Sequence, residues 1–282
     1  MEKLKIPFYQ IDAFAAEPFQ GNPAAICILQ KWLDDKTLQN IAAENNLAET
    51  SYMIAQPDGY AIRWFTSLGE INLCGHATLA SAHVAFEHLN FPHSKIKFTT
   101  REVGDLFVTR QNHNSIMDSP AWMPGPEPDC LPDAVKGLGG IASESTHSAR
   151  DYMLVYKDAE TIRNIRPDFR ILAGLGKLIC ITAPGEDCDF VSRFFCPGDS
   201  VEEDPATGSA HCMLAPYWAQ RLNKPQLIAR QFSPRGTAEI LCHVKGDRVE
   251  LSGRAVTVIE GIMTLPLRPG AKTLHSPGAP SH

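Results

Sequence analysis

The chain has 282 residues, of which 44% are hydrophobic and 21% charged, and these values exclude a disordered or fibrous protein. Its formal net charge is −6, and the sequence holds no dense block of Lys and Arg that would neutralise a row of phosphates. No apolar run reaches the ~18 residues that span a membrane, and the first residues lack the apolar core of a secretory signal. We therefore expect a cytoplasmic protein whose partners are neither nucleic acids nor membranes.

The cysteines and glycines form no metal or nucleotide motif. The eight cysteines include no Cys-x-x-Cys pair and no zinc-ribbon spacing, so we expect reduced thiols and no structural zinc site. The glycine-rich stretches at 137–140 and 174–177 match neither the P-loop nor the dinucleotide-binding pattern. Nucleotide binding is therefore not indicated.

The first half of the chain mixes strand and helix signals. Asp34 is placed to cap a helix that carries Leu38 and Ile41 on its apolar side. A second helix begins near Gly75 and His76, and its many small residues are typical of a helix buried on most sides. The predicted strands are residues 8–14, 24–29, 52–54, 61–65, 95–98, 106–109 and 115–118, with a turn at 21–23.

The second half repeats this order of elements. Five prolines between 120 and 132 interrupt the pattern and indicate a domain boundary near 118–130. Strands are predicted at 152–155, 178–182 and 190–195, and a helix at 208–222. We therefore predict a first half at 1–118, completed by a strand near 262–267, a second half at 119–261, and a disordered tail at 268–282.

Two segments of the chain share an ordered set of residues. The first reads Arg63-Trp64-Phe65, then Glu70, then Cys74-Gly75-His76-Ala77; the second reads Arg193-Phe194-Phe195, then Glu203, then Thr207-Gly208-Ser209-Ala210. Glu and Gly are five residues apart in both copies, and the two glycines lie 133 positions apart, close to half of the chain. We interpret this pattern as an internal duplication.

The repeat has a chemical meaning if each copy is a strand, a loop and a helix that begins at the glycine. A helix N-terminus carries unpaired N–H groups and a partial positive charge, so it binds anions. Two such helix starts that face each other would hold a carboxylate and stabilise negative charge beside it. In the alternative interpretation, Gly75 and Gly208 are only helix-entry glycines of a duplicated fold.

Four residues are candidates for chemistry around these helix starts. Glu49 lies between a helix and an apolar strand, where burial would favour its protonated form and make it a proton shuttle. His76 and Ser209 follow the two glycines, and Asp204 precedes the second one. The alternatives are a charge on a solvated strand edge for Glu49, a structural histidine, a first-turn hydroxyl and a helix-capping acid.

Several further motifs occur in order along nearly the whole chain. They are Asp12-Ala13-Phe14, Gly21-Asn22-Pro23-Ala24-Ala25, Asn46-Leu47-Ala48-Glu49-Thr50, Ile62-Arg63-Trp64-Phe65-Thr66, Leu73-Cys74-Gly75-His76-Ala77-Thr78, Glu203-Asp204-Pro205-Ala206-Thr207-Gly208-Ser209-Ala210-His211 and, near the end, Gly253-Arg254-Ala255 with Glu260-Gly261. With these motifs the sequence resembles the phenazine-biosynthesis F (PhzF-like) isomerase family, in its broad branch that includes MAWD-binding-protein-like members.

The resemblance implies an α+β, diaminopimelate-epimerase-like fold of two pseudo-symmetric halves, each a β-barrel or roll around a central helix, with the site between them. It implies an isomerase that moves a proton along a small unsaturated or carboxylate-bearing metabolite, without metal or organic cofactor. A homodimer is expected as well. The implied catalytic residues are Glu49, His76, Asp204 and Ser209, and the implied substrate-binding residues are Asn22, Cys74, Gly75, Thr207 and Gly208.

Two other functions stay open. A two-thiol epimerase of this fold needs a cysteine before each helix glycine, and here Cys74 occupies the first position but Thr207 the second. An interaction protein that keeps the fold and binds a protein partner is the alternative from another class. At a helix N-terminus we also expect the pKa of the Cys74 thiol to fall.

Overall fold

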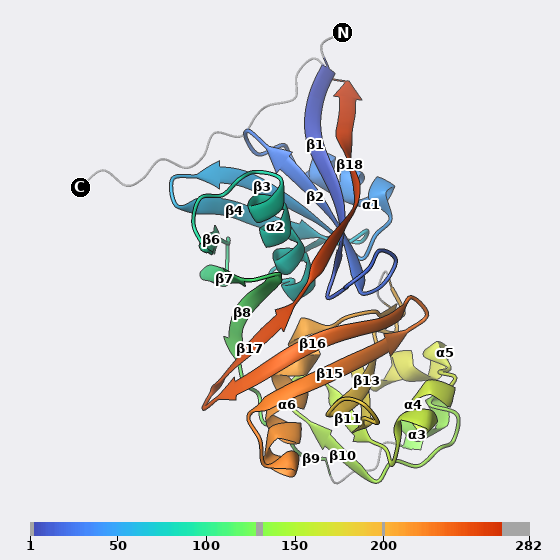
Figure 1. The fold of residues 1–282 in the computed structure, drawn as a ribbon. Coiled ribbons are helices and arrows are strands. Elements are labelled where there is room, and N and C mark those ends of the chain that lie inside the picture. Colours follow the sequence, from blue (N-terminus) through green and yellow to red (C-terminus); the bar gives the residue numbers. More distant parts are fainter. Residues whose placement is uncertain (1–2, 128–131, 199–200, 267–282) are drawn as a thin grey trace, which may run out of the picture.

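The computed structural model describes residues 3–127, 132–198 and 201–266 (Figure 1). The predicted tail at 268–282 lies outside these ranges. Within them, no helix is both long enough and apolar enough to cross a membrane.

The first half of the chain forms a curved sheet around one central helix. Its elements are β1 (Lys3–Ala13), β2 (Asn22–Leu29), α1 (Asp35–Asn45), β3 (Glu49–Gln56), β4 (Gly59–Phe65), β5 (Glu70–Ile71), α2 (Gly75–Glu87), β6 (Lys95–Thr99), β7 (Asp105–Gln111) and β8 (Asn114–Pro120). The predicted cap is present, since the Asp34 carboxylate accepts a hydrogen bond from the backbone N–H of Thr37.

The second half adds a sheet around α6 and a group of short helices. Its elements are β9 (Gly125–Pro126), α3 (Pro132–Gly137), β10 (Ser145–Ser148), β11 (Tyr152–Val155), α4 (Ala159–Asn164), α5 (Phe169–Leu172), the 3-10 turn η1 (Ala173–Leu175), β12 (Ile179–Pro184), β13 (Phe190–Phe195), β14 (Glu203–Asp204), α6 (Gly208–Leu222), β15 (Gln226–Ser233), β16 (Gly236–Lys245), β17 (Arg248–Gly253) and β18 (Ala255–Pro266).

The two halves share one sequence of strand pairings. In the first half, β1–β2, β3–β4, β6–β7 and β7–β8 are antiparallel, while β2–β3 and β4–β6 are parallel. In the second half, β10–β11, β12–β13, β15–β16 and β16–β17 are antiparallel, while β11–β12 and β13–β15 are parallel. The duplication predicted from five residue types therefore extends to the whole strand topology.

The halves are joined by pairing and by exchanged strands. Strands β8 and β17 pair antiparallel, with Met117 opposite Leu251, and lie side by side between the halves (Figure 1). The strand after β8, β9, pairs with β10, the first strand of the second half, whereas the strand after β17, β18, returns to pair with β1 along its length. Each half thus contributes its next strand to the other half.

This return differs from the predicted strand position. The sequence assigned residues 255–261 to the second half and a completing strand to 262–267. In the structure, β18 already pairs with β1 from Ala255, which lies opposite Ala13. The chain crosses between the halves at Arg254, directly after β17.

The central helices are buried because their side chains are small or apolar. Helix α2 is buried on nearly all sides and packs against β1, β2, β3, β7, β8 and β18. Helix α6 packs against β15, β16 and β17, and Trp218 stacks on Phe190 at 5.8 Å between ring centroids. One core cluster extends around both helices, so the two N-termini are anchored in the same packed interior.

The turn between β1 and β2 depends on Gly21. Its φ is +60°, and a Cβ at this position would lie 2.2 Å from the carbonyl oxygen of Ala13. Only glycine fits this close, left-handed backbone, so the predicted turn glycine is explained. Because Asn22 is the first residue of β2, the turn also fixes where the Asn22 side chain enters the molecule.

Candidate functional site

The two central helices begin next to each other. A Cβ built on Gly75 would lie 3.9 Å from the Cα of Gly208, and a Cβ on Gly208 would lie 3.9 Å from the Cα of Gly75. The strand residues next to the two glycines correspond as well. Gly75 faces Met117 of β8, Gly208 faces Leu251 of β17, and Met117 and Leu251 lie opposite each other in the β8–β17 pair. The expected pair of facing helix starts is therefore present in the structure.

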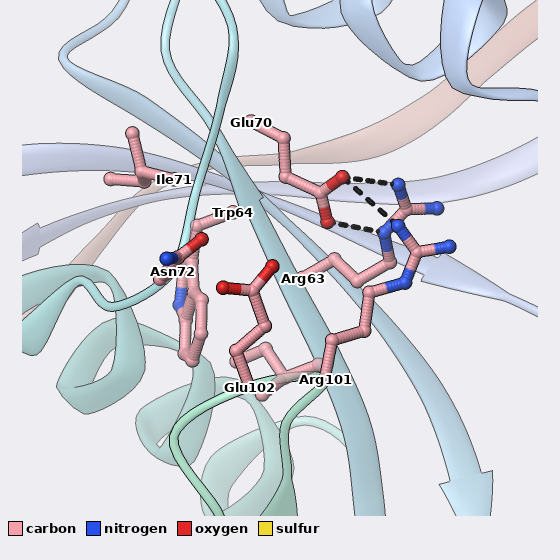
Figure 2. A pocket seen from close by; sticks show the side chains of 8 residues that line it. Arg63, Trp64, Glu70, Ile71, Asn72, Arg101 and Glu102 are labelled. Carbon is pink, nitrogen blue, oxygen red and sulfur yellow. Dashed lines mark hydrogen bonds and ion pairs between the residues drawn. The ribbon is translucent and has the colours of Figure 1, made fainter.

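The Arg and Glu of the repeat explain how the segment before each helix is held. In the first copy, Nε and Nη2 of Arg63 donate to the two Glu70 carboxylate oxygens, both at 2.6 Å. Figure 2 shows the guanidinium groups of Arg63 and Arg101 directed at the same Glu70 carboxylate. This pair ties β5 to β4, five residues before the helix start.

The second copy makes the same bidentate pair. Nε and Nη2 of Arg193 donate to Glu203 at 2.7 and 3.0 Å, and Nη1 donates to the carbonyls of Ile162 and Ile165. Because Asp204 follows Glu203 directly, the pair fixes the backbone from which the Asp204 side chain extends. The repeat is therefore a positioning device as well as a mark of duplication.

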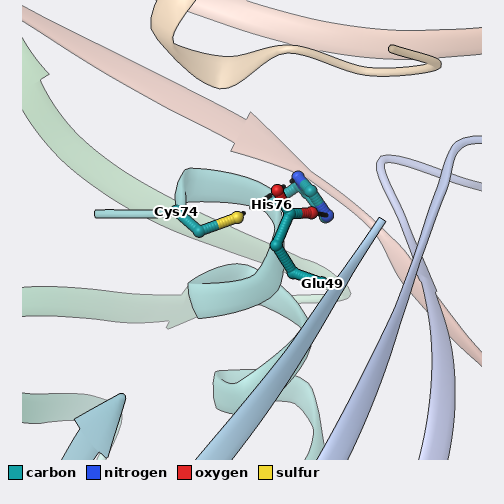
Figure 3. A group of neighbouring side chains, drawn as sticks. All are labelled: Glu49, Cys74 and His76. Atoms are coloured by element: carbon teal, nitrogen blue, oxygen red, sulfur yellow. Dashed lines mark hydrogen bonds and ion pairs between the residues drawn. The ribbon is translucent and has the colours of Figure 1, made fainter. Parts of the chain in front are cut away.

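Glu49 and His76 come together at the first helix start. Glu49 is the first residue of β3, and His76 lies in the first turn of α2. The Glu49 Oε2 and His76 Nε2 atoms are 3.0 Å apart, while Cys74 Sγ lies 3.5 Å from the other ring nitrogen, Nδ1 (Figure 3). Glu49 Oε2 and His76 Nε2 make no aligned hydrogen bond within the described residues, so charge and packing hold this contact.

Asn22 links this group to the second helix start. Its Nδ2 donates to Asp204 Oδ1 at 2.6 Å and to the Ala206 carbonyl at 3.1 Å. The same Nδ2 lies 3.1 Å from His76 Nδ1. Asn22 therefore bridges the histidine of one half and the carboxylate of the other.

Gln231, which was not among the residues predicted for the site, holds the second helix start in place. Its Oε1 accepts the Thr207 backbone N–H at 2.9 Å, and its Nε2 donates to Thr207 Oγ1 and to the Asp204 carbonyl. Thr207 Oγ1 in turn donates to Asp204 Oδ2. The sequence does hold one indication of this role. Leu227, Ala229 and Gln231 alternate along β15 and share its buried face, and a buried polar side chain requires hydrogen-bond partners.

The helix starts open into a cleft made of two adjoining pockets of about 680 and 480 Å³. We use "the cleft" for both pockets together. The residues that line both are Glu49, Leu73, Arg150, Asp204, Thr207 and Ser209. Cys74, Gly75, His76 and Gly208 line the larger pocket alone. The structure thus brings the sequence-predicted residues to one cleft, with Asn22 directly behind them.

Burial and neighbouring charges shift the pKa values of the groups in the cleft. Desolvation raises the pKa of Asp204 to about 6, and the nearby His76 opposes this rise. Desolvation opposes protonation of His76, but Cys74 and Glu49 overcome it and raise the pKa of that imidazole well above its ordinary value. Two ionisable groups in the cleft therefore hold protons more tightly than in water.

The expected fall in the pKa of Cys74 is wrong. The side chain is buried, and desolvation together with the Glu49 carboxylate raises the pKa of its thiol above the ordinary value. Cys74 is consequently a neutral thiol at pH 7. The position of Cys74 as N-cap of α2 corresponds to that of Thr207 as N-cap of α6.

Glu49, Cys74 and His76 also form a group of donor atoms within 4.8 Å of one another, which is a spacing compatible with a metal ion. However, His76 directs Nε2 to Glu49 and Nδ1 to Cys74, and a single ring nitrogen serves a given ion. Because the two ring nitrogens face different neighbours, the arrangement fits an imidazole placed between a carboxylate and a thiol better than a shared ion.

Fold and site together define a class of duplicated α+β proteins with a cleft at two facing helix starts. The chain belongs to the phenazine biosynthesis-like family, whose model matches residues 11–261. It is 45% identical over 263 residues to an uncharacterized isomerase of Pseudomonas aeruginosa, covering 93% of this chain and all of that protein. It is 34% identical over 289 residues to the mouse phenazine biosynthesis-like domain-containing protein 1, again covering 93% of this chain and all of the relative.

Solved structures agree with the predicted fold class. A crystal structure of a PhzF-family phenazine biosynthesis protein from Enterococcus faecalis has a TM-score of 0.88 at 42% identity, covering 92% of this chain and 99% of that one. A hydroxyproline epimerase from Agrobacterium vitis has a TM-score of 0.57 at 10% identity over 95% of this chain and 94% of that one, a likeness of fold alone. The α+β, diaminopimelate-epimerase-like fold expected from the sequence is confirmed.

Proposed function

We propose that the protein is an isomerase that moves a proton along a small unsaturated or carboxylate-bearing metabolite, with Glu49 as the acid/base. The observation that carries this proposal is the Glu49–His76 contact of 3.0 Å beside two helix starts that open into one cleft. A relative named as an isomerase supports the same reaction class.

In this proposal, some groups of the cleft bind the substrate and others transfer the proton. Backbone N–H groups at the starts of α2 and α6 receive the substrate carboxylate, because both helix N-termini carry partial positive charge. Glu49 removes a proton from carbon and returns it to another carbon of the same unsaturated system, so atoms and charge balance without an external oxidant or reductant. His76 holds Glu49 in place, while Asp204 and Ser209 face the substrate from the second helix start.

Proton transfer by these groups requires no cofactor, as the sequence resemblance implies. A two-thiol mechanism is disfavoured, because Thr207 occupies the second thiol position and the Cys74 thiol is neutral at pH 7. An interaction protein on the same fold would not need an open cleft at the helix starts that is lined by Glu49, His76 and Asp204.

The proposal is tested by a turnover-based screen of small carboxylate metabolites against the wild type and the Glu49→Gln variant. We expect the wild type to convert at least one acid into an isomer of equal mass. The variant, which keeps the side-chain size, should lose ~10²–10⁴-fold in rate. Full activity of Glu49→Gln on the substrate found in the screen would refute the role of Glu49.

A further inference from the structure

Arg150 is a cationic side chain of the cleft that the proposed reaction does not yet use. It lies in the short loop between β10 and β11 and lines both pockets, together with Asp204, Thr207 and Ser209. Among the described residues that line the smaller pocket, it is the single Lys, Arg or His side chain. Its side chain is 44% exposed, so the guanidinium is accessible from the cleft.

The guanidinium of Arg150 is held in place from one edge. Its Nε and Nη2 both contact Asp151 Oδ2, at 2.9 and 2.7 Å, and the Asp151 side chain is buried. The guanidinium carbon lies 5.7 Å from the ring centroid of Trp122, whose backbone N–H donates to the Cys212 carbonyl of α6. Nη1 makes no hydrogen bond within the described ranges, so one edge of the fork is available to a ligand.

The charges that line the cleft indicate which ligand the free Nη1 edge of Arg150 would bind. Glu49 and Asp204 both line the cleft, and each carboxylate repels an anionic substrate. The partial positive charges at the N-termini of α2 and α6 offset the negative charge of one substrate carboxylate. A guanidinium with a free edge forms strong, charge-assisted hydrogen bonds to a further carboxylate.

We propose that the substrate is a dicarboxylic acid, with one carboxylate at the starts of α2 and α6 and the second on Arg150. This inference rests on the proposed function and specifies the class of its substrate. Arg150 is then the residue that determines specificity for dicarboxylates, while proton transfer remains with Glu49.

The test uses matched pairs of acids on ¹⁵N-labelled protein: succinate with butyrate, and glutarate with pentanoate. Binding is followed by the amide resonances of Gly75, Gly208 and Ser209. The wild type should bind each dicarboxylate about tenfold or more tightly than its monocarboxylate partner. Arg150→Gln should remove this preference and leave the monocarboxylate affinity within about twofold.

Two further variants serve as controls. Arg150→Lys keeps the charge without the planar fork and should retain part of the preference. Arg170→Gln removes an exposed arginine that pairs with Asp168 outside the cleft, so the preference should be unchanged.

The outcomes separate the inference from the proposed function. Equal binding of both acids by the wild type, or an unchanged preference in Arg150→Gln, overturns the role of Arg150 and leaves the helix-start site standing. If no acid shifts the Gly75 and Gly208 amides, the substrate-binding role of the helix starts and the dicarboxylate inference are both refuted.

Discussion

Cys74 and Glu49 both touch His76, but burial assigns them different roles. The raised pKa of Cys74 keeps its sulfur neutral, and Thr207 in the equivalent position cannot complete a pair of thiols. We therefore expect Cys74→Ala to keep its activity within about tenfold of the wild type, and alkylation of Cys74 by iodoacetamide to be slow. An inactive Cys74→Ala beside an active Glu49→Gln would instead favour a one-thiol mechanism.

Asp204 should make the stability of the fold depend on pH. Burial raises its pKa from 3.8 to about 6, so between these values the folded state keeps a proton that the unfolded state has lost. The contribution of Asp204 to stability is therefore largest below pH 4, falls as the pH rises to 6, and is constant above that. The total change corresponds to about 3 kcal/mol.

Thermal unfolding of the wild type and Asp204→Asn at pH 4.5, 6 and 8 measures this effect. The variant should gain stability relative to the wild type as the pH rises, with most of the gain complete at pH 6–7. A difference between the two proteins that is independent of pH would show that Asp204 titrates normally.

At the level of residues, the sequence predicted the groups that belong to a motif and missed those that do not. Glu49, His76 and Asp204 lie beside the repeated glycines or at a strand start, so local patterns single them out. Gln231 comes to the second helix start through the pairing of β15 with β13, and Arg150 reaches the cleft through the loop after β10. Their positions depend on tertiary structure, which no local spacing encodes.

At the level of elements, the duplicated Arg–Glu pairs are the feature that connects fold and site. In Arg193→Met, Glu203 would be a buried carboxylate without its partner, and the Ile162 and Ile165 carbonyls would lose their donor. We expect a loss of about 3–5 kcal/mol in unfolding free energy, measured by urea denaturation. Arg170→Met, which breaks an exposed pair, is the control and should change the midpoint little.

If Arg193→Met lowered the unfolding free energy no more than the control Arg170→Met, the positioning role of the Arg193–Glu203 pair would be contradicted. Where the protein stays folded, its activity should fall as well, because Asp204 follows Glu203 in the chain.

The elements that the sequence predicted well are those with strong local signals. Helix α6 begins and ends at the predicted residues, and the Asp34 cap of α1 is present. The helices α3, α4 and α5 have only four to six residues, too few to develop a helical period, and they were not predicted. The last strand was predicted too short because its polar and apolar residues do not alternate regularly.

At the level of the whole molecule, the exchange of β9 and β18 makes the two halves depend on each other. Five matched residue types were enough to predict the duplication, because a repeated helix start needs the same residues in both copies. The exchange itself depends on which sheet receives each strand, and that choice is made by long-range pairing. The sequence therefore predicted two halves but not how they interlock.

We expect the protein to form a homodimer, since closed twofold assemblies are the commonest oligomers. Light scattering at micromolar concentration should give about twice the chain mass of 31.0 kDa. A monomeric mass would refute this expectation. The proposed reaction would still stand, because one chain supplies both helix starts together with Glu49 and His76.

The most direct test of the central claim follows hydrogen exchange during turnover in D₂O, with the substrate identified by the metabolite screen. A carboxylate that takes a proton from carbon exchanges it with solvent, so wild-type product, and substrate recovered at partial conversion, should carry deuterium. Glu49→Gln should lose both isomerisation and deuterium incorporation, whereas Cys74→Ala should retain both. Unchanged turnover and labelling in Glu49→Gln would contradict the assignment of Glu49 as the proton-transfer residue.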